Sequence, residues 1–336
     1  MRKLSLALVL VLLTACAPAP TPPTVVVYTS VDQVYAEPVL KAFAQRTGIR
    51  VQPVYDVEAT KTTGLVNRLL AERDNPRADV WWSGEFAQTM QLQAAGVLAP
   101  YQSPAATDIP AVYRDPAGYW TGIAGRARVL LVNTQRLAPE SHPSSLQDLL
   151  DEDLPGAQVG IAYPLFGTTA THAAALYAAW GREAARDYFT KLQAKGVRVV
   201  DGNSVVRDMV AEGQLACGLT DTDDACGAVE KGAPVKIIYL DQEEGGLGTL
   251  LIAGTAALVA GGPHPQQGQA LIDYLVSAEV EKDLVASGWC QVPLRSTVAP
   301  PACPPGPAPR GMAVGLEAIW RQMETANADL REIFVR

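Results

Sequence analysis

A short run of acidic residues is the strongest candidate for binding chemistry in this sequence. Asp221, Asp223 and Asp224 follow one another closely. Carboxylate oxygens are the ligands that hard cations such as Fe³⁺, Mn²⁺, Ca²⁺ and Mg²⁺ prefer. The run is not a calcium-binding EF-hand loop, because Cys226 stands where that loop needs glycine and Gly232 where it needs glutamate. Helix capping is the alternative, since acidic side chains are favoured in the first turn of a helix.

Small polar residues at predicted helix starts form a second candidate site, here for an anion. Free backbone N–H groups and the helix dipole favour negative charge at a helix N-terminus, and an arginine can add a bidentate contact to phosphate or carbonate. Ordinary helix capping by the threonines is the alternative interpretation. The candidate anion-binding or ligand-binding residues are Ser30, Thr62, Thr63, Arg126, Gly167, Thr168 and Thr169.

Two adjacent tryptophans, Trp81 and Trp82, lie in a predicted strand. Successive strand residues point to opposite faces of a sheet, so one indole is expected in the core. The other, for which Trp82 is the candidate, could stack on an organic ligand or a cation. Core positions for both side chains are the alternative.

Catalytic patterns are missing from the sequence. The three histidines, His142, His172 and His264, are scattered, and no HExxH, GxSxG, P-loop or GxGxxG pattern occurs. We therefore expect no catalytic residue and no catalytic cofactor. An exported hydrolase is the weaker function class.

The amino terminus predicts export. Arg2 and Lys3 precede an apolar stretch from Leu4 to Leu13, which is too short to span a bilayer and is typical of a secretory signal. It ends in Leu-Thr-Ala-Cys, which resembles the lipobox of bacterial lipoproteins and implies an acylated Cys16 outside the cytoplasmic membrane. Residues 1–15 are then the signal and residues 16–23 a proline-rich tether. An ordinary cleaved signal is the alternative.

Charge and cysteine content agree with an exported globular body. The formal charge of −8 argues against nucleic acid or an anionic membrane surface as a partner. Cys290 and Cys303 flank a proline-rich loop and are the predicted disulfide, which an oxidising compartment would allow. The pairing state of Cys217 and Cys226 stays open.

Strands and helices alternate along the chain, which implies parallel sheets whose ligands bind beyond the carboxyl ends of the strands. Strands near Gly125 to Asn133 and Gly248 to Val259 are predicted to join two α/β lobes as a hinge, with a ligand cleft between the lobes. We expect residues 24–124 and 258–300 in the first lobe and 125–257 in the second. Residues 301–336 are expected to form a loop and a helix on an unassigned lobe.

Three segments carry a family resemblance: VVVYTS from Val25, ADVWWSGE from Ala78 and GRARVLLVN from Gly125. Their order and spacing resemble the periplasmic solute-binding family that includes binders of ferric iron, thiamine, and phosphonates or sugar phosphates. The resemblance extends from about Val25 to about Leu294. It implies a two-lobed type II binding protein, expected to be a monomer, that delivers a small ligand to the permease of an ABC importer.

The resemblance also implies binding residues. Ferric binders of this family take one metal ligand from the loop after the first strand, matched near Asp32, and a carboxylate matched by Glu85. Their adjacent tyrosine pair is replaced here by Asp223 and Asp224. Fe³⁺ or another hard metal ion held by these four residues, with a partner anion, is the leading hypothesis. A phosphorylated or phosphonate compound and an organic cation such as thiamine or a polyamine are the alternatives.

Overall fold

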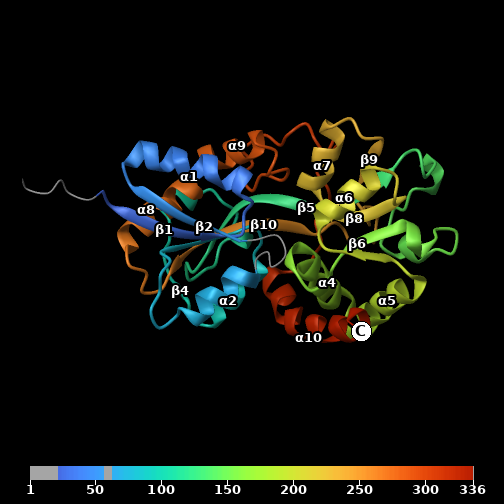
Figure 1. Cartoon of the computed structure of the whole chain (residues 1–336), viewed down its shortest axis with the longest axis horizontal. Coiled ribbons are helices and arrows are strands. Elements are labelled where there is room, and N and C mark those ends of the chain that lie inside the picture. The colour runs from blue at the N-terminus through green and yellow to red at the C-terminus, as the bar shows by residue number, and fades with distance from the viewer. Residues whose placement is uncertain (1–21, 57–62, 336) are drawn as a thin grey trace, which may run out of the picture.

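The computed structural model describes residues 22–56 and 63–335. Two α/β lobes lie side by side, and a continuous ten-stranded sheet runs through both of them (Figure 1). Cys16 and Thr62 lie outside the described residues. None of the helices in the described part of the chain has the length and apolar character of a membrane span.

The first lobe begins with strand–helix–strand units, as the sequence predicts. The β-branched run at the start of the chain forms β1, which pairs in parallel with β2 and β3. Gly48 ends α1 because it adopts a left-handed conformation, φ 70°, which glycine reaches without steric cost. The elements are β1 (Thr24–Thr29), α1 (Gln33–Thr47), β2 (Arg50–Tyr55), α2 (Thr63–Ala71), β3 (Val80–Ser83), α3 (Ala87–Ala94) and β4 (Leu98–Ala99).

The second lobe repeats the pattern around β6, which lies between β8 and β7 and is parallel to both. The central strands β6 and β8 are short and fully buried, and the helices that follow the parallel strands begin near a common edge of the sheet. The elements are β6 (Val159–Ala162), α4 (Gly167–Trp180), α5 (Arg182–Lys195), β7 (Arg198–Val200), α6 (Asn203–Ala211), β8 (Cys217–Asp221), α7 (Thr222–Glu230) and β9 (Val235–Ile238).

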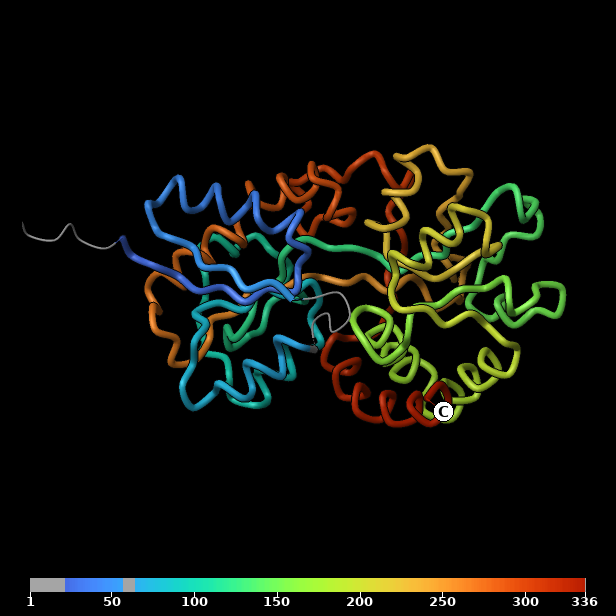
Figure 2. Tube along the Cα trace, in the orientation of Figure 1, coloured from blue at the N-terminus to red at the C-terminus, as the bar shows by residue number. Residues whose placement is uncertain are grey.

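Two long antiparallel strands, β5 (Thr121–Asn133) and β10 (Leu251–Val259), connect the lobes. β5 pairs with β10 up to Ala127 and with β8 from Arg128 onward, so one strand belongs to both halves of the sheet. The trace in Figure 2 shows the two strands crossing the middle of the molecule. The predicted lobe boundaries themselves stay a prediction.

A third segment passes beside these strands after the first lobe is completed by α8 (Pro265–Leu275) and α9 (Ala278–Ala286). The backbone N–H groups of Gln291 and Val292 both donate to the carbonyl of Gly125, at 3.0 and 2.9 Å. A Cβ atom at position 125 would lie 2.5 Å from the Val292 carbonyl oxygen, so this close approach requires glycine.

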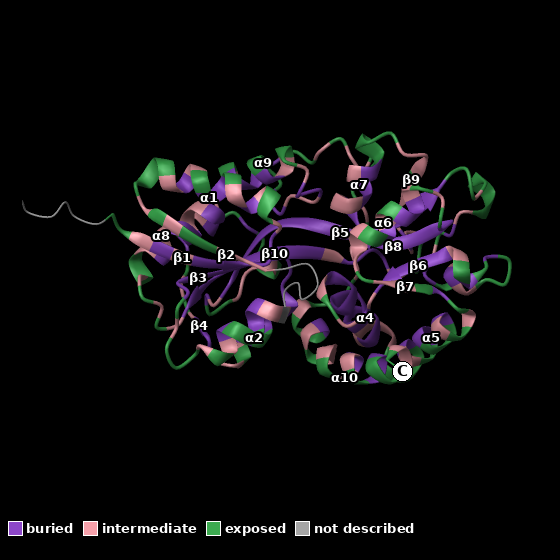
Figure 3. Cartoon of the chain, viewed as in Figure 1, coloured by how far each residue is buried: buried purple, intermediate pink, exposed green. Residues whose placement is uncertain are grey.

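The described residues bury most of the sheet and expose the outer faces of the helices (Figure 3). One apolar cluster extends under the sheets of both lobes and includes Trp81, Leu130 and Leu176. Two further clusters lie on the other face, one in each lobe. Helices therefore cover both faces of the sheet, as expected for parallel strands.

The carboxyl-terminal helix α10 (Leu316–Phe334) packs on α4 and α5 of the second lobe and also contacts α3 of the first. Among the described carboxylates of α10, only that of Asp329 is fully buried, and the residue is 1 % exposed. Asp329 accepts hydrogen bonds from the Tyr177 hydroxyl at 3.2 Å, from Arg182 at 2.8 and 2.9 Å, and from Arg186 at 2.6 Å.

We expect Asp329→Ala to lower the free energy of unfolding by about 2 kcal/mol, because it removes charged hydrogen bonds and leaves the buried Tyr177 hydroxyl without its acceptor. Urea unfolding followed by circular dichroism measures the change. Glu332→Ala is the control, since Glu332 also pairs with Arg186 but is exposed. Equal losses in the two variants would contradict this interpretation of Asp329.

The predicted Cys290–Cys303 disulfide is wrong. Cys303 is bonded to Cys226 on α7, with a Cα–Cα distance of 5.8 Å, whereas Cys217 and Cys290 are free and buried. Cys290 lies in the first-lobe core, where its sulfur accepts from the Gly125 N–H at 3.5 Å. The proline-rich loop does not turn back to Cys290, because it continues to the second lobe and meets α7 there.

Candidate functional site

A cavity of about 410 Å³ lies between the lobes and is lined by both of them. The first lobe contributes the loop after β1, the start of α1 and the turn after β3. The second lobe contributes the starts of α4, α6 and α7, and the crossing strand β5 adds Arg126. The predicted site residues that line it are Ser30, Asp32, Glu85, Arg126, Gly167, Thr168, Thr169, Asp223 and Asp224.

Asp32 directly precedes α1, and Tyr35 lies in the first turn of that helix. Both side chains are half-buried and line the cavity. Burial raises the pKa of Tyr35, and the nearby carboxylates Asp223, Asp32 and Asp224 raise it further. The phenol of Tyr35 therefore faces acidic groups from both lobes. The sequence interpretation missed this residue, although Tyr35 lies shortly after the predicted site residue Asp32 in the sequence.

Glu85 follows β3 and caps α3. Its Oε2 accepts from the Ala87 N–H at 2.7 Å and its Oε1 from the Gln88 N–H at 2.9 Å. The hydroxyl of Thr171 on α4 also donates to Oε2 at 3.0 Å, which joins the two lobes. Glu85 is 2 % exposed, and burial raises its pKa despite these hydrogen bonds. Both the capping alternative and the cavity position thus apply to this carboxylate.

Ser30 supports the same turn from the first lobe. Its hydroxyl accepts from the Gly84 N–H at 3.0 Å and lies 3.4 Å from the hydroxyl of Ser83. Ser30 is 4 % exposed, so its hydroxyl is engaged in holding the turn that carries Glu85.

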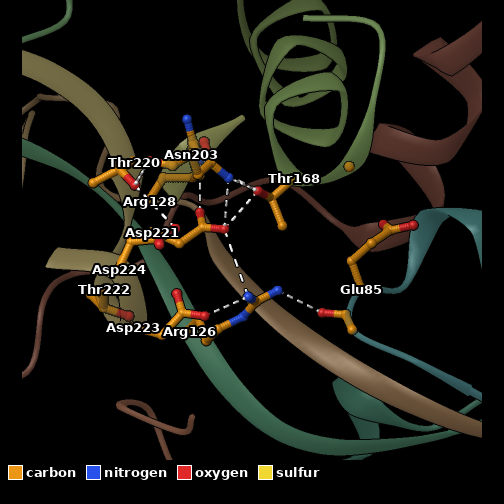
Figure 4. Close-up of polar contacts among 12 residues, drawn as sticks. Glu85, Arg126, Arg128, Thr168, Asn203, Thr220, Asp221, Thr222, Asp223 and Asp224 are labelled. Atoms are coloured by element: carbon orange, nitrogen blue, oxygen red, sulfur yellow. Dashed lines mark hydrogen bonds and ion pairs between the residues drawn. The ribbon is translucent and has the colours of Figure 1, made fainter. Parts of the chain in front are cut away.

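Arg126 lies at the centre of the site (Figure 4). It donates to Oδ2 of Asp223 on α7 at 2.9 Å and to the Gly84 carbonyl of the first lobe at 2.9 Å. Its guanidinium lies 5.3 Å from the ring centroid of Trp289. Burial alone would lower the pKa of Arg126, but Asp223 and Asp221 outweigh it and raise the pKa. Arg126 therefore stays charged although it is only 8 % exposed.

Asp224, the neighbouring acidic residue on α7, pairs with a different arginine. Arg207 on α6 donates to its Oδ1 at 3.1 Å, and the Thr220 hydroxyl donates to its Oδ2 at 3.3 Å. The Arg207 side chain is 20 % exposed and also binds Asp208 at 2.8 Å. This pair lies nearer to solvent than the pair of Arg126 and Asp223.

A second buried arginine, Arg128, contacts residues that line the cavity. It donates to Oδ1 of Asp221 at 2.8 Å and to Oδ1 of Asn203 at 3.1 Å. Asp221 also accepts from the Thr168 hydroxyl at 2.6 Å. Burial alone would raise the pKa of Asp221, but Arg128, Arg126 and the Thr168 hydroxyl hold it below its usual value.

This network joins the starts of α4, α6 and α7. Sequence reasoning named Thr168 and noted Asp221 but assigned no role to Arg128 or Asn203. The GRAR segment was the available signal, because two arginines in alternate strand positions point to the same face of the sheet.

The prediction that Trp82 faces the ligand cleft is wrong, because Trp82 does not line the cavity. It is fully buried in the first-lobe core with Val27 and Leu40. Both faces of β3 are covered by helices, so neither indole of the pair reaches the cavity. The tryptophan that lines the cavity is Trp289, in the third crossing segment.

Thr169 and Thr63 complete the predicted residues. The Thr169 hydroxyl donates to Asn203 at 3.3 Å, and Thr169 is 7 % exposed. Thr63 is the first residue of α2. His172 is buried in α4, where burial and Arg128 lower its pKa to about 3, so it is neutral.

The site brings the four predicted metal-binding carboxylates to one cavity, where Glu85 accepts three hydrogen bonds and Asp223 and Asp224 each pair with an arginine. Among residues 22–56 and 63–335, no three His, Cys, Asp or Glu side chains lie close enough to hold a metal ion by themselves. The cavity instead combines paired carboxylates and a phenol with the N-termini of α4 and α6. Such a lining can accept a cation and an anion together.

The chain is similar in sequence to known binding and uptake proteins. A putative 2-aminoethylphosphonate-binding periplasmic protein of Salmonella paratyphi A is 28% identical over 264 residues, covering 77% of this chain and 74% of the relative. Iron uptake protein A1 of Synechocystis is 26% identical over 289 residues, covering 81% and 76%.

Solved structures show the same fold. Iron-bound HitA from Pseudomonas aeruginosa superposes with a TM-score of 0.82 at 22% identity, covering 94% of this chain and 100% of that one. AfuA from Actinobacillus pleuropneumoniae, with fructose-6-phosphate bound, gives 0.81 at 21% identity, with the same coverage. The predicted two-lobed type II fold is confirmed. Because residues 23–290 match the family of bacterial extracellular solute-binding proteins, the chain belongs to that family, which is one of binding proteins rather than enzymes.

Proposed function

We propose that this chain is the monomeric binding component of an ABC importer, held at the outer side of the cytoplasmic membrane by a lipidated Cys16, and that it captures Fe³⁺ or another hard metal ion with a partner anion. The observation that carries the proposal is the cavity between the lobes, lined by Asp32, Asp223, Asp224 and Tyr35 together with two helix N-termini.

The donor atoms support a hard cation. Carboxylate and phenol oxygens are hard ligands, and the cavity offers no soft sulfur ligand among the described residues. Within residues 22–56 and 63–335, no three acidic side chains lie close enough to hold a metal ion together, so these residues alone supply an incomplete ligand set. A partner anion bound at the start of α4 fills the remaining positions in this proposal. The Trichodesmium structure, which is in complex with iron and citrate ligands, supports a metal ion bound together with an anion.

Removing the two aspartates of α7 tests this function. Protein purified without chelator is expected to contain iron or another hard metal ion, and the double variant Asp223→Ala, Asp224→Ala is expected to contain none. Elemental analysis of the purified proteins measures the metal.

The matched control is Glu183→Ala with Asp187→Ala, two exposed acidic residues on α5 outside the cavity lining. The control should retain the wild-type metal content. Unchanged metal in the Asp223 and Asp224 variant would count against the metal proposal.

An aminophosphonate is the second candidate, favoured by a specific observation. The carboxylates of Asp223 and Asp224 are already paired with arginines, while the N-termini of α4 and α6 line the cavity and suit a phosphonate. The ammonium group of such a ligand would face the acidic residues. Thermal unfolding with 2-aminoethylphosphonate distinguishes the candidates, since a ligand at a hundred times its Kd adds about 2.7 kcal/mol of stability. Stabilisation of metal-free protein would favour the phosphonate.

A further inference from the structure

Phe166 is an exposed aromatic residue in the cleft between the lobes. It directly precedes α4, lines the cavity and is 42 % exposed. Its ring packs against that of Tyr163, with the ring centroids 5.7 Å apart, and Tyr163 lines the same cavity. Of the six large apolar side chains that are exposed among residues 22–56 and 63–335, only Phe166 and Val34 line the cavity. Apolar surface therefore stays accessible inside a site that is otherwise rich in charge.

Val34 adds apolar surface from the opposite lobe. It lies in the first turn of α1 and is 72 % exposed. Because α1 belongs to the first lobe and Phe166 to the second, both lobes bring an exposed apolar side chain to the cavity. Exposed apolar residues are ordinary when they are scattered singly, but a group of them around one cavity indicates a contact surface. A ligand with an apolar part would remove this surface from water, which is favourable.

The size and the aromatic residues of the cavity fit an organic ligand. Its volume of about 410 Å³ falls in the range of about 300 to 1,000 Å³ that is typical of sites for such ligands. The aromatic side chains that line it are Tyr35, Tyr163, Phe166 and Trp289. The phenol of Tyr35 faces acidic groups and Trp289 lies against Arg126, whereas the rings of Tyr163 and Phe166 contact each other. The pair of Tyr163 and Phe166 therefore suits packing against an organic ring.

An anion-binding helix start lies directly beside this aromatic pair. Gly167 and Thr168 follow Phe166 and begin α4, and the first N–H groups of a helix have no partner within that helix. The Thr168 hydroxyl donates to Asp221 at 2.6 Å (Figure 4), so an anion here would meet the backbone N–H groups. The Nε of Arg126, which also lines the cavity, is buried and has no acceptor within the described residues. A ligand that uses both features needs a negative group attached directly to an aromatic ring.

We propose that the partner anion of the metal ion is an aromatic chelator of the 2-hydroxybenzoate class, whose ring packs on Phe166 while its oxygens bind the metal between the lobes. This inference rests on the proposed metal-binding function and names the chemical class of its partner anion. The phenolate oxygen and one carboxylate oxygen bind the ion, and the other carboxylate oxygen faces the start of α4. The phenol releases its proton to water as its oxygen binds the metal, so the step needs no oxidant or reductant.

Salicylate and malonate are a matched pair of probes for this proposal. Both chelate Fe³⁺ through a pair of oxygens in a chelate ring of the same size, but only salicylate carries an aromatic ring. Isothermal titration calorimetry of the metal-free mature chain measures the Kd for Fe³⁺ with each chelator in excess. The wild type is expected to bind the salicylate complex more tightly than the malonate complex by about tenfold, which is the size of a good aromatic contact.

Variants of the apolar residues show whether this preference comes from the ring contact. Phe166→Ala is expected to abolish it, because the change removes the ring and leaves the acidic residues and the helix start in place. Phe166→Tyr should keep it, and Val34→Ala should weaken it less than Phe166→Ala. Val112→Ala, which alters an exposed apolar residue outside the cavity lining, is the control and should match the wild type. Circular dichroism verifies that each variant is folded.

The ratio of the two Kd values is the informative quantity. The stability of each iron complex in solution is the same for every variant, so a change in the ratio reports the contact between the protein and the aromatic ring. A general loss of structure would raise both Kd values together and leave the ratio unchanged.

The outcomes separate this inference from the metal-binding function. A wild type that binds the salicylate complex no more tightly than the malonate complex overturns the aromatic partner and leaves metal binding standing. The same preference for salicylate in Phe166→Ala and the wild type also overturns it. Failure of the wild type to bind Fe³⁺ with salicylate, malonate, citrate or carbonate overturns both proposals.

Discussion

Loss of the Cys226–Cys303 disulfide is expected to lower the free energy of unfolding by about 4 kcal/mol, because the bond closes a ring with a sequence separation of 77 residues. The ring leaves α7, returns through β10 to the first lobe and comes back along the third crossing segment. Its removal therefore frees many conformations in the unfolded chain. Urea unfolding of the double variant Cys226→Ser, Cys303→Ser, followed by circular dichroism, measures the loss.

Reductant provides the control for this prediction. The wild type and Cys290→Ser both keep the bond and should each be destabilised by dithiothreitol, whereas the double variant should not respond. Peptide mapping without reduction should recover a peptide linked through Cys226. A linked peptide that contains Cys290, or equal unfolding midpoints with and without reductant, would contradict the assignment.

Local patterns in the sequence predicted the regular elements well. The β-branched run from Val25 lies in β1 (Thr24–Thr29), and Gly48 ends α1 (Gln33–Thr47). These features depend on residues close in the chain, namely a β-branched run and a glycine in a left-handed conformation. The crossing strands were also located, although β5 begins at Thr121, earlier than Gly125.

Long-range pairing could not be predicted in the same way. Cys303 and Cys226 are far apart in sequence, and nothing local distinguishes Cys226 from Cys290 as the partner. The prediction that Trp82 faces the ligand failed for a related reason. Alternation along a strand separates two faces, but it does not say whether helices cover both, and all residues of β3 are buried.

In the candidate site too, local features could be predicted from the sequence, whereas long-range contacts could not. Acidic and small polar residues at the ends of strands and the starts of helices indicated where the cavity lies, because these ends gather at one edge of an α/β sheet. Their hydrogen-bond partners did not follow, because Arg126 and Arg128 reach carboxylates 97 and 93 positions away in the sequence. The arginines change the chemistry of the cleft, since they neutralise carboxylates that the sequence presented as ready metal ligands.

The buried pair of Arg128 and Asp221 is expected to be the most sensitive point of the second lobe. Both side chains are 2 % exposed, and Asp221 accepts hydrogen bonds from residues at the starts of α4 and α6. Asp221→Asn leaves Arg128 buried without its counter-charge, so we expect a loss of about 3 to 5 kcal/mol in the free energy of unfolding. Urea unfolding at neutral pH measures it, and Glu317→Gln, in an exposed pair on α10, should leave stability unchanged.

Acid provides an independent check of the same pair. Because the folded state holds the pKa of Asp221 below its usual value, the carboxylate contributes stability above a pH of about 4, the ordinary value for aspartate. That contribution is lost as the pH falls through the lower pKa of the folded state. Asp221→Asn cannot titrate at this position, so its free energy of unfolding should fall less steeply than that of the wild type below a pH of about 4. Parallel acid profiles for the two proteins would show that Asp221 is not charged in the folded chain, and the loss expected at neutral pH would then lack its cause.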